Sequence, residues 1–412
     1  MTSALTGSAP VTAFAPDAAR MRAVVSRLAA DDFAGRRVGS AGGRAAAAWL
    51  ADHLRQSGAT VILDEFPITG AVRQVYATPR LAVTKRESTA ELVFRRDFCE
   101  HLASADVADP RTGRLAVVDD PYLAGAWVLD TAWSADRAAD AAAAGALGVL
   151  VPRSTDAAGW MPKMVAGPAT VGLPVLAVRS EIHDRMRATA GQAIVTATVP
   201  LRAVDVIGTN VIGTFRPPRR GALSVLVTAH FDGVGDDPAQ RLPAACDNAS
   251  GVAAIIETAR VLHTILPAEV GLSVALLDGE EAGGHGSARH ARFVQDGTFI
   301  INLDGAAELR GAAAVEAGGP AQPLLAALDV AGRLVGVPLL ARAMASDNRR
   351  YAAAGLPAVG IGMDMPGYQT PAETPDRVRS ETLVAAARLV VATAVKLAEA
   401  VNPASYPRPS RS

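Results

Sequence analysis

The sequence predicts an α/β fold in which a mostly parallel sheet is flanked by helices, with a β-rich segment inserted into it. From residue 201 onward, short apolar runs alternate with helical patterns, the order expected for a parallel sheet covered on both faces. Residues 72–200 instead carry closely spaced β-like runs. The chain has 412 residues, half of them hydrophobic, so its length favours two domains rather than one.

The segment before residue 72 is predicted to belong to the α/β domain. One amphipathic helical pattern covers residues 21–33, and a second covers residues 42–58 and ends at a glycine. Residues 59–68 follow as a predicted strand. We therefore assign residues 1–71 to the first part of the main domain.

The segment 72–200 is predicted to form a small β-rich domain with one helix. Its helical pattern is Ala-rich and covers residues 134–147. Turn residues separate its β-like runs, which are residues 80–85, 90–94, 114–120, 148–152, 173–178 and 193–199.

The segment 201–402 is predicted to complete the α/β domain. The expected strands are residues 209–215, 222–232, 271–281, 298–306 and 356–363. The expected helices are residues 247–266, 286–297, 322–336 and 380–401. An Asn/Ser capping signal opens the first of these helices. The polar residues 403–412 are predicted to be a disordered tail.

Composition excludes several classes of partner. The net charge is −1 and no sustained basic run occurs, which argues against binding to nucleic acid. No apolar run reaches the ~20 residues of a membrane-spanning helix. The first 22 residues lack a basic start and a continuous apolar region, so we expect no signal peptide, no membrane partner and a cytoplasmic location. Cys99 and Cys246 are the two cysteines, too few for a disulfide framework.

Acidic and imidazole side chains follow three predicted strands and precede one predicted helix. They are His230, Asp232, Asp247, Glu280, Glu281 and Asp304. An open α/β sheet places its site beyond the carboxyl ends of its strands, so these side chains are expected to converge on one edge.

The residue types in this group are those of a hydrolytic zinc site. Such a site needs His and carboxylate ligands together with a free carboxylate that serves as general base. The adjacent Glu280 and Glu281 can divide these tasks, one binding metal and the other handling the proton of a water. His230 and Asp232 lie on the same side of a strand, so Asp232 is expected to orient the imidazole.

The motifs and their order closely resemble the M28 family of zinc aminopeptidases and carboxypeptidases. The matching motifs, from His230 to Val378, are HFD, ACDNASG, EEAGGHGS, NLD, SDNRRYAAAGLPAVGIG and GYQTPAETPDRV. Residues 72–200 resemble the protease-associated (PA) domain that many members insert. The M20 family uses a similar ligand order but inserts a dimerisation domain where this chain has 65 positions, from Asp304 to Gln369, which is too few.

The resemblance implies a zinc-aminopeptidase-like fold and a role for each matched residue. Glu280 would be the general base and acid. The implied zinc ligands are His230 and Asp304 on one ion, Asp247 as the bridge and Glu281 on the second ion, with Asp232 supporting His230. The fifth ligand should be the His of a Tyr-His-Thr-Pro motif, but this sequence has Gln369 at that position.

Gln369 leaves the second zinc site open to three outcomes. A glutamine carbonyl binds zinc less well than imidazole does. No His follows His290, and His285, the one closest in sequence to a ligand, is either a ligand or a surface turn residue. The three alternatives are a chain that holds one zinc tightly, a chain that uses Gln369 as a weak ligand, and a chain that acts as a binding module or on a small amide metabolite.

We expect a metal-dependent hydrolase that cleaves a peptide or amide bond, with zinc as cofactor. Retention of Glu280 favours activity, because a group of unpaired converging carboxylates would otherwise cost stability. Two further sets of residues are ambiguous. Ser346 and Asp347 lie at the site rim or cap a helix; Met363, Met365 and Tyr368 line a substrate pocket or pack in the core.

Overall fold

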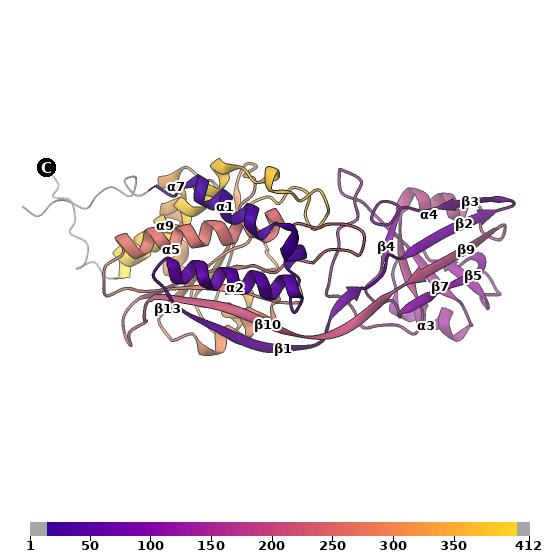
Figure 1. The fold of residues 1–412 in the computed structure, drawn as a ribbon, viewed down its shortest axis with the longest axis horizontal. Coiled ribbons are helices and arrows are strands. Elements are labelled where there is room, and N and C mark those ends of the chain that lie inside the picture. Colours follow the sequence, from indigo (N-terminus) through magenta and orange to yellow (C-terminus); the bar gives the residue numbers. More distant parts are fainter. Residues whose placement is uncertain (1–14, 402–412) are drawn as a thin grey trace, which may run out of the picture.

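The computed structural model describes residues 15–401 as an elongated molecule built around two eight-stranded sheets (Figure 1). The first sheet, with its flanking helices, lies at one end of the long axis, and the second sheet lies at the other. The predicted α/β fold with helices flanking a sheet is confirmed. The predicted tail, residues 403–412, lies outside the described residues.

The first sheet is parallel at its centre and antiparallel towards its margins. Its strands, in spatial order, are β1 (Thr60–Val75), β10 (Leu201–Arg216), β12 (Gly271–Leu277), β11 (Ser224–His230), β13 (Thr298–Leu303), β16 (Ala358–Gly362), β14 (Ala313–Gly318) and β15 (Leu339–Ala341). The strands β12, β11, β13 and β16 are mutually parallel. The pairs β1–β10, β10–β12 and β14–β16 are antiparallel, so the predicted mostly parallel order applies to the centre.

Helices cover both faces of this sheet. One face carries α1 (Ala18–Leu28), α2 (Ala41–Gln56), α5 (Ser250–Ile265) and α9 (Ser380–Val401), with α7 (Gln322–Val335) packed in the same core. The other face carries α6 (His285–His290) and α8 (Asn348–Ala353). Val225 and Val227 of β11 face the first group, and Leu226 faces the second. This alternation explains why β11 is apolar at successive positions.

Several predicted helices are shorter in the structure than the sequence pattern suggested, among them the two that lie next to the site. The predicted helix 247–266 begins at Ser250, because residues 245–249 form a separate turn. The predicted capping residue Asn248 still accepts a hydrogen bond from the backbone N of Gly251, at 3.0 Å. The predicted helix 286–297 is limited to α6 and a 3₁₀ turn, Ala291–Phe293, before the chain turns into β13.

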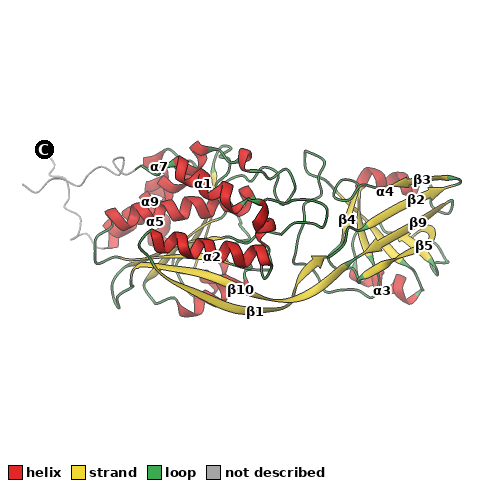
Figure 2. Ribbon diagram, viewed as in Figure 1, coloured by secondary structure: helices red, strands yellow, loops and turns green. Residues whose placement is uncertain are grey.

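The second sheet is formed by strands between residues 80 and 199, and Figure 2 shows few helices beside it. Its elements are β2 (Arg80–Lys85), β3 (Ser88–Glu91), β4 (Phe98–Glu100), β5 (Val107–Val117), β6 (Ala126–Leu129), α3 (Ala135–Ala143), β7 (Gly148–Arg153), β8 (Val175–Arg179), α4 (Ser180–Arg187) and β9 (Ala193–Val199). It has its own core around Trp127, Leu150 and Val195. The sequence pattern missed β4, β6 and α4, each of eight residues or fewer.

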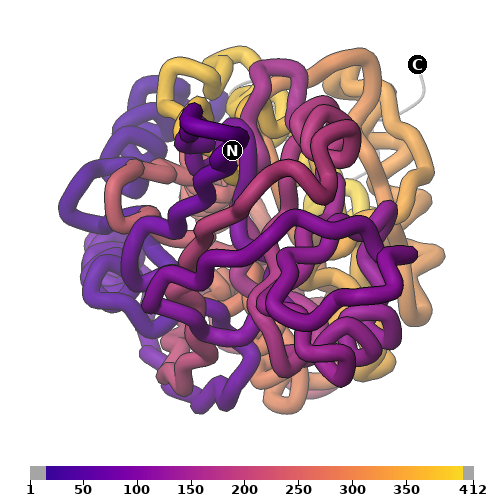
Figure 3. The backbone as a smooth tube through the Cα atoms, turned by 90° about the vertical axis from the view of Figure 1, so that its right-hand side faces the viewer, coloured from indigo at the N-terminus to yellow at the C-terminus, as the bar shows by residue number. Residues whose placement is uncertain are grey.

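A two-stranded ribbon joins the two sheets. β1 and β10 pair antiparallel from Thr60 opposite Thr214 to Val75 opposite Leu201, with an irregularity between Ile68 and Val72. The ribbon runs along the long axis in Figure 1, and Figure 3 looks down that axis from the side of the second sheet. The chain therefore enters and leaves the second sheet at neighbouring positions. The division at residues 72 and 200 remains our proposal.

A buried ionic cluster also connects the two sheets. The Arg95 Nε atom lies 2.7 Å from Asp237 Oδ2, and the Lys163 Nζ atom lies 3.0 Å from Asp237 Oδ1. Glu100 pairs with Arg95 at 2.8 Å. Arg95, Glu100 and Lys163 belong to the second unit, the segment from β2 to β9 that carries the second sheet (residues 80–199), whereas Asp237 lies in the loop after β11. Burial works against ionisation of Asp237, but the two cations hold the pKa of its carboxyl below its ordinary value.

The first turn of α1 is bound to α5 through Glu257. This contact predicts that the stability of the fold depends on pH. Burial works to raise the pKa of Glu257, but hydrogen bonds from Arg20 and Arg260 lower it to about 2. The unfolded carboxyl titrates near 4.5, so the ionised group stabilises the fold above that pH. We expect a contribution of about 1–2 kcal/mol at pH 7, lost as the pH falls from 4.5 towards 2.

Thermal unfolding of wild type and Glu257→Gln at several pH values measures this effect. The gap between their melting temperatures should be widest above pH 5 and should narrow in acid, since both carry a neutral group there. Asp329→Asn, which removes an exposed ion pair with Arg333, is the control and should show little gap at any pH. A Glu257→Gln gap that is constant from pH 7 to pH 3 would contradict the assignment.

Candidate metal centre and active site

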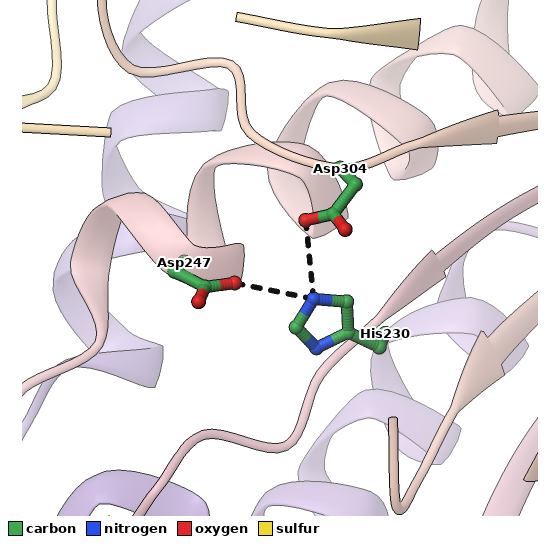
Figure 4. A group of neighbouring side chains, drawn as sticks. All are labelled: His230, Asp247 and Asp304. Carbon is green, nitrogen blue, oxygen red and sulfur yellow. Dashed lines mark hydrogen bonds and ion pairs between the residues drawn. The ribbon is translucent and has the colours of Figure 1, made fainter. Parts of the chain in front are cut away.

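Three of the predicted ligands converge at the carboxyl edge of the first sheet (Figure 4). His230 ends β11, Asp304 follows β13, and Asp247 lies in the turn before α5. The Nε2 atom of His230 lies 3.2 Å from Asp247 Oδ1 and 3.2 Å from Asp304 Oδ1. One ligand atom from each residue lies within 4.8 Å of the others. The edge of the sheet therefore presents one nitrogen and two oxygens to a common point.

The imidazole of His230 is fixed from its other side. Its Nδ1 atom lies 3.1 Å from the backbone O of Asp232. A carbonyl oxygen can only accept, so Nδ1 carries the proton and Nε2 presents a lone pair towards the carboxylates. The Asp232 carboxylate is 3.6 Å from Nδ1 and accepts hydrogen bonds from the backbone N atoms of Glu280 and Glu281. Asp232 thus supports the imidazole mainly through its carbonyl, and its side chain holds the turn after β12.

This donor set fits a divalent cation. A neutral imidazole would direct the Nε2 lone pair at two carboxylate oxygens, an arrangement that requires a proton or a metal ion among them. Burial works to lower the pKa of His230, but the nearby carboxylates, Asp304 foremost, raise it well above its ordinary value. One imidazole and two carboxylates are a ligand set that zinc accepts, with room for further ligands.

Buried polar side chains hold the two aspartates in place. Asn248, next to Asp247, donates to the backbone O of Leu303 at 3.0 Å and accepts from the backbone N of Gly305 at 3.0 Å. The strand end that carries Asp304 is thereby tied to the turn that carries Asp247. The peptide bond between Asp247 and Asn248 is cis.

Glu281 and Gln369, the other two predicted ligands, bind each other instead of joining the three ligands above. The Nε2 atom of Gln369 donates to Glu281 Oε2 at 2.6 Å. Gln369 is buried and its φ is 53°, in the left-handed region. The Oε1 atoms of both residues are buried without a hydrogen-bond partner among the described residues. The Gln369 amide therefore engages one oxygen of Glu281 that a second metal ion would need.

Glu373 is a buried residue of the site whose role the sequence analysis missed. Its Oε1 atom accepts from the backbone N atoms of Cys246 and Asp247, at 3.0 and 2.5 Å, and its Oε2 atom accepts from the backbone N of Gln369 at 2.7 Å. Burial raises the pKa of Glu373 well above its ordinary value. One carboxylate thus joins the Asp247 turn to the Gln369 turn. Its only signal in the sequence was an acidic residue close to Gln369.

The Gln369 turn also contacts the second unit. The backbone O of Gln369 accepts a hydrogen bond from the backbone N of Lys163, at 3.0 Å. The side chain of the same lysine donates to the backbone O atoms of Gly235 and Asp236, at 2.8 and 2.9 Å. Lys163 therefore links the second unit to the site loop and to the loop after β11.

Glu280 lies on the wall of a cavity of about 400 Å³ that also reaches Asp247 and Asp304. Burial raises the pKa of Glu280 well above its ordinary value. Met363, Met365 and Tyr368, which were predicted to line a pocket or to pack, all line this cavity. The predicted base, the converging ligands and a space for a substrate are therefore adjacent.

Of the residues that the sequence left ambiguous, His285, Ser346 and Asp347 supply no ligand to the group, although Ser346 hydrogen-bonds to the Asp304 carboxylate. His285 begins α6, and Cys246 is buried with its thiol 3.5 Å from the backbone O of Pro366. Ser346 accepts a hydrogen bond from the Asn302 side chain at 3.0 Å. Asp347 is buried before α8 and makes no side-chain capping bond there, so helix capping does not explain it.

Comparison with known proteins points to one family. Residues 210–394 match the model for Peptidase family M28. Aminopeptidase YwaD of Bacillus subtilis (strain 168) is 29% identical over 157 residues, which are 38% of this chain and 32% of that protein. The match thus spans about a third of that relative's length.

The fold is similar to that of solved aminopeptidases. BSAP, a zinc aminopeptidase from Bacillus subtilis, superposes with a TM-score of 0.70 at 20% identity, covering 94% of this chain and 96% of that one. The aminopeptidase from Aneurinibacillus sp. strain AM-1 gives a TM-score of 0.69 at 22% identity, covering 97% and 99%. Both likenesses extend over the two sheets.

Proposed function

We propose that this chain is a metal-dependent hydrolase of the aminopeptidase type and a member of Peptidase family M28, whose model residues 210–394 match. It would cleave a peptide or amide bond with one firmly held zinc ion. The main support is the convergence of His230 Nε2, Asp247 Oδ1 and Asp304 Oδ1 beside the cavity that Glu280 lines. We also propose that residues 72–200 are a PA-type insert. Among residues 15–401 no helix is long and apolar enough to cross a membrane, and the cytoplasmic location stays a prediction.

Each residue of the site has a distinct task in the proposed reaction. His230, Asp247 and Asp304 would hold the zinc ion, whose contribution would be Lewis-acid activation of the scissile carbonyl and of a water. Glu280 would take the proton of the attacking water and deliver it to the leaving amine. Asp232 would keep both the imidazole and the Glu280 backbone in position through the contacts described above.

Metal content together with a substrate panel tests the proposal. We expect about one equivalent of tightly held zinc per chain, and hydrolysis that a chelator abolishes and zinc restores. The panel should contain aminoacyl anilides, dipeptides and acylated amino acids. A protein that binds less than one equivalent of any divalent metal would contradict the proposal. Metal binding without hydrolysis of any panel member would favour a binding module instead.

Gln369→His is expected to raise the zinc content from about one to about two equivalents per chain. The substitution removes the amide that engages Glu281 and supplies an imidazole nitrogen in its place. Histidine tolerates the left-handed backbone of this position, so folding should be retained. Metal analysis after dialysis, with calorimetric titration of the apoprotein, measures the change.

Gln369→Asn is the matched control. It keeps an amide but shortens the side chain, so it should weaken the Glu281 contact without adding a zinc ligand. We expect it to hold about one equivalent of zinc, as the wild type does. A wild-type protein that holds two zinc ions as tightly as Gln369→His would show that Gln369 does not limit the second site.

A further inference from the structure

Arg342 is the basic residue among the described residues that line the site cavity. It follows β15, the edge strand of the first sheet, and its backbone N donates to the backbone O of Val315 on β14 at 3.0 Å. The side chain is exposed. The backbone of Arg342 is thus fixed to β14, and Arg342 lines the same cavity wall as Glu280 and Asp304.

The guanidinium of Arg342 has no ion-pair or hydrogen-bond partner among residues 15–401, although acids lie nearby in the sheet. Glu316, on the adjoining strand β14, is already bound by Arg349 at 3.0 Å and by the backbone N of Met344 at 2.9 Å. Asp364, which also lines the cavity, accepts from the backbone N of Arg310 at 3.2 Å. Glu316 and Asp364 therefore already accept hydrogen bonds from other donors, and the Arg342 guanidinium is free to bind a ligand.

Apart from Tyr368 and the four acids Asp247, Glu280, Asp304 and Asp364, the rest of the cavity lining is apolar. The small or apolar residues that line the cavity are Ala312, Ala314, Ala343, Met344, Ala345, Gly362, Met363 and Met365. Hydrogen bonds to a charged partner gain strength where water is partly excluded, and a planar guanidinium matches a carboxylate with two parallel bonds. These surroundings favour an anionic group of a bound molecule as the partner of the Arg342 guanidinium.

We propose that Arg342 binds a carboxylate of the substrate, so that the enzyme prefers anionic peptides or amides. The proposal rests on the hydrolase function proposed above. The carboxylate has two sources with the same chemistry: an acidic side chain on the residue whose bond is cleaved, or the free α-carboxylate of a short peptide. Arg342 is a specificity-determining residue here, and it takes no part in the proton transfers assigned to Glu280.

Two matched substrate pairs test the proposal and separate the two sources. Glutamyl and glutaminyl para-nitroanilide differ in the side-chain charge, and Ala-Ala and Ala-Ala amide differ in the terminal charge. In at least one pair, zinc-loaded wild type should favour the anionic member by about 10- to 100-fold in kcat/KM. Arg342→Gln should reduce that ratio to about one and change the neutral member about twofold or less, whereas Arg342→Lys should retain part of the preference.

Arg333→Gln is the matched control, because it removes an exposed arginine on α7 that is ion-paired with Asp329. It should leave both substrate ratios unchanged, which separates a local contact from the general charge of the protein. An Arg342→Gln variant with the wild-type ratio in both pairs would overturn the proposal.

A binding measurement separates failure of this proposal from failure of the hydrolase assignment. Calorimetry on zinc-loaded protein compares glutamate with glutamine, and Ala-Ala with its amide, without requiring turnover. The anionic member of a pair should bind more tightly to wild type, and Arg342→Gln should abolish the difference. If no substrate is hydrolysed but this difference is present, the hydrolase function fails while Arg342 keeps its role. If neither pair shows a difference, the role of Arg342 is wrong whatever the activity.

Discussion

Replacing Glu280 by Gln is expected to lower kcat by about 10²- to 10⁴-fold while zinc content stays unchanged. The amide keeps the size and the backbone contact to Asp232 but cannot accept the proton of the attacking water. Glu280 is not among the three converging ligands, so its loss should leave metal affinity in place. Steady-state kinetics with metal analysis of the same preparations separates the two quantities.

Glu399→Gln provides the control, because Glu399 pairs with Lys396 on α9, away from the cavity. We expect wild-type kcat for that variant. Two results would count against the role of Glu280: a Glu280→Gln enzyme within about threefold of wild type, or a loss of activity that matches a loss of zinc.

Asp237→Asn is expected to destabilise the protein by about 3–5 kcal/mol, the largest stability effect that we predict. The substitution keeps the shape of the side chain but removes the negative charge that lies between two buried cations. Arg95 would retain only Glu100 as an ionised partner, and Lys163 would retain no ionised partner, only neutral acceptors such as the backbone carbonyls of Gly235 and Asp236. Uncompensated buried charge costs far more than the loss of a surface pair.

Thermal and urea unfolding of Asp237→Asn and of Asp120→Asn makes the comparison. Asp120 pairs with Arg114 in the same second unit, but at a partly exposed position. Its loss should cost about 0–1 kcal/mol. Equal destabilisation by the two variants would mean that the buried cluster contributes no more than a surface pair.

The position of the metal ligands was predictable from the sequence because it follows from topology. His230 and Asp304 each follow a strand of one parallel sheet, and the carboxyl ends of parallel strands share an edge. Asp247 precedes a helix that begins at that edge. Order and spacing along the chain were therefore sufficient to predict that these three residues meet.

The contacts among the site loops were not predictable in this way. The Gln369 amide reaches Glu281, and the Glu373 carboxylate joins two turns, through side-chain packing between segments about 90 to 130 positions apart. The contact between Lys163 and the Gln369 turn could be predicted only if the position of the second unit relative to the first sheet were known. No periodicity in a single sequence carries that information. The edge strand β15 was missed because it has only three residues.

The ribbon of β1 and β10 joins the second unit to one edge of the first sheet. Val75 and Leu201 face each other as hydrogen-bonded neighbours, so a short reverse turn could close the ribbon there and leave the pairing from Thr60 to Val75 intact. The 125 positions between them are thus topologically optional for the sheet that carries the metal ligands. The second unit contributes a contact to the site, because the backbone N of its Lys163 donates a hydrogen bond to the turn of Gln369.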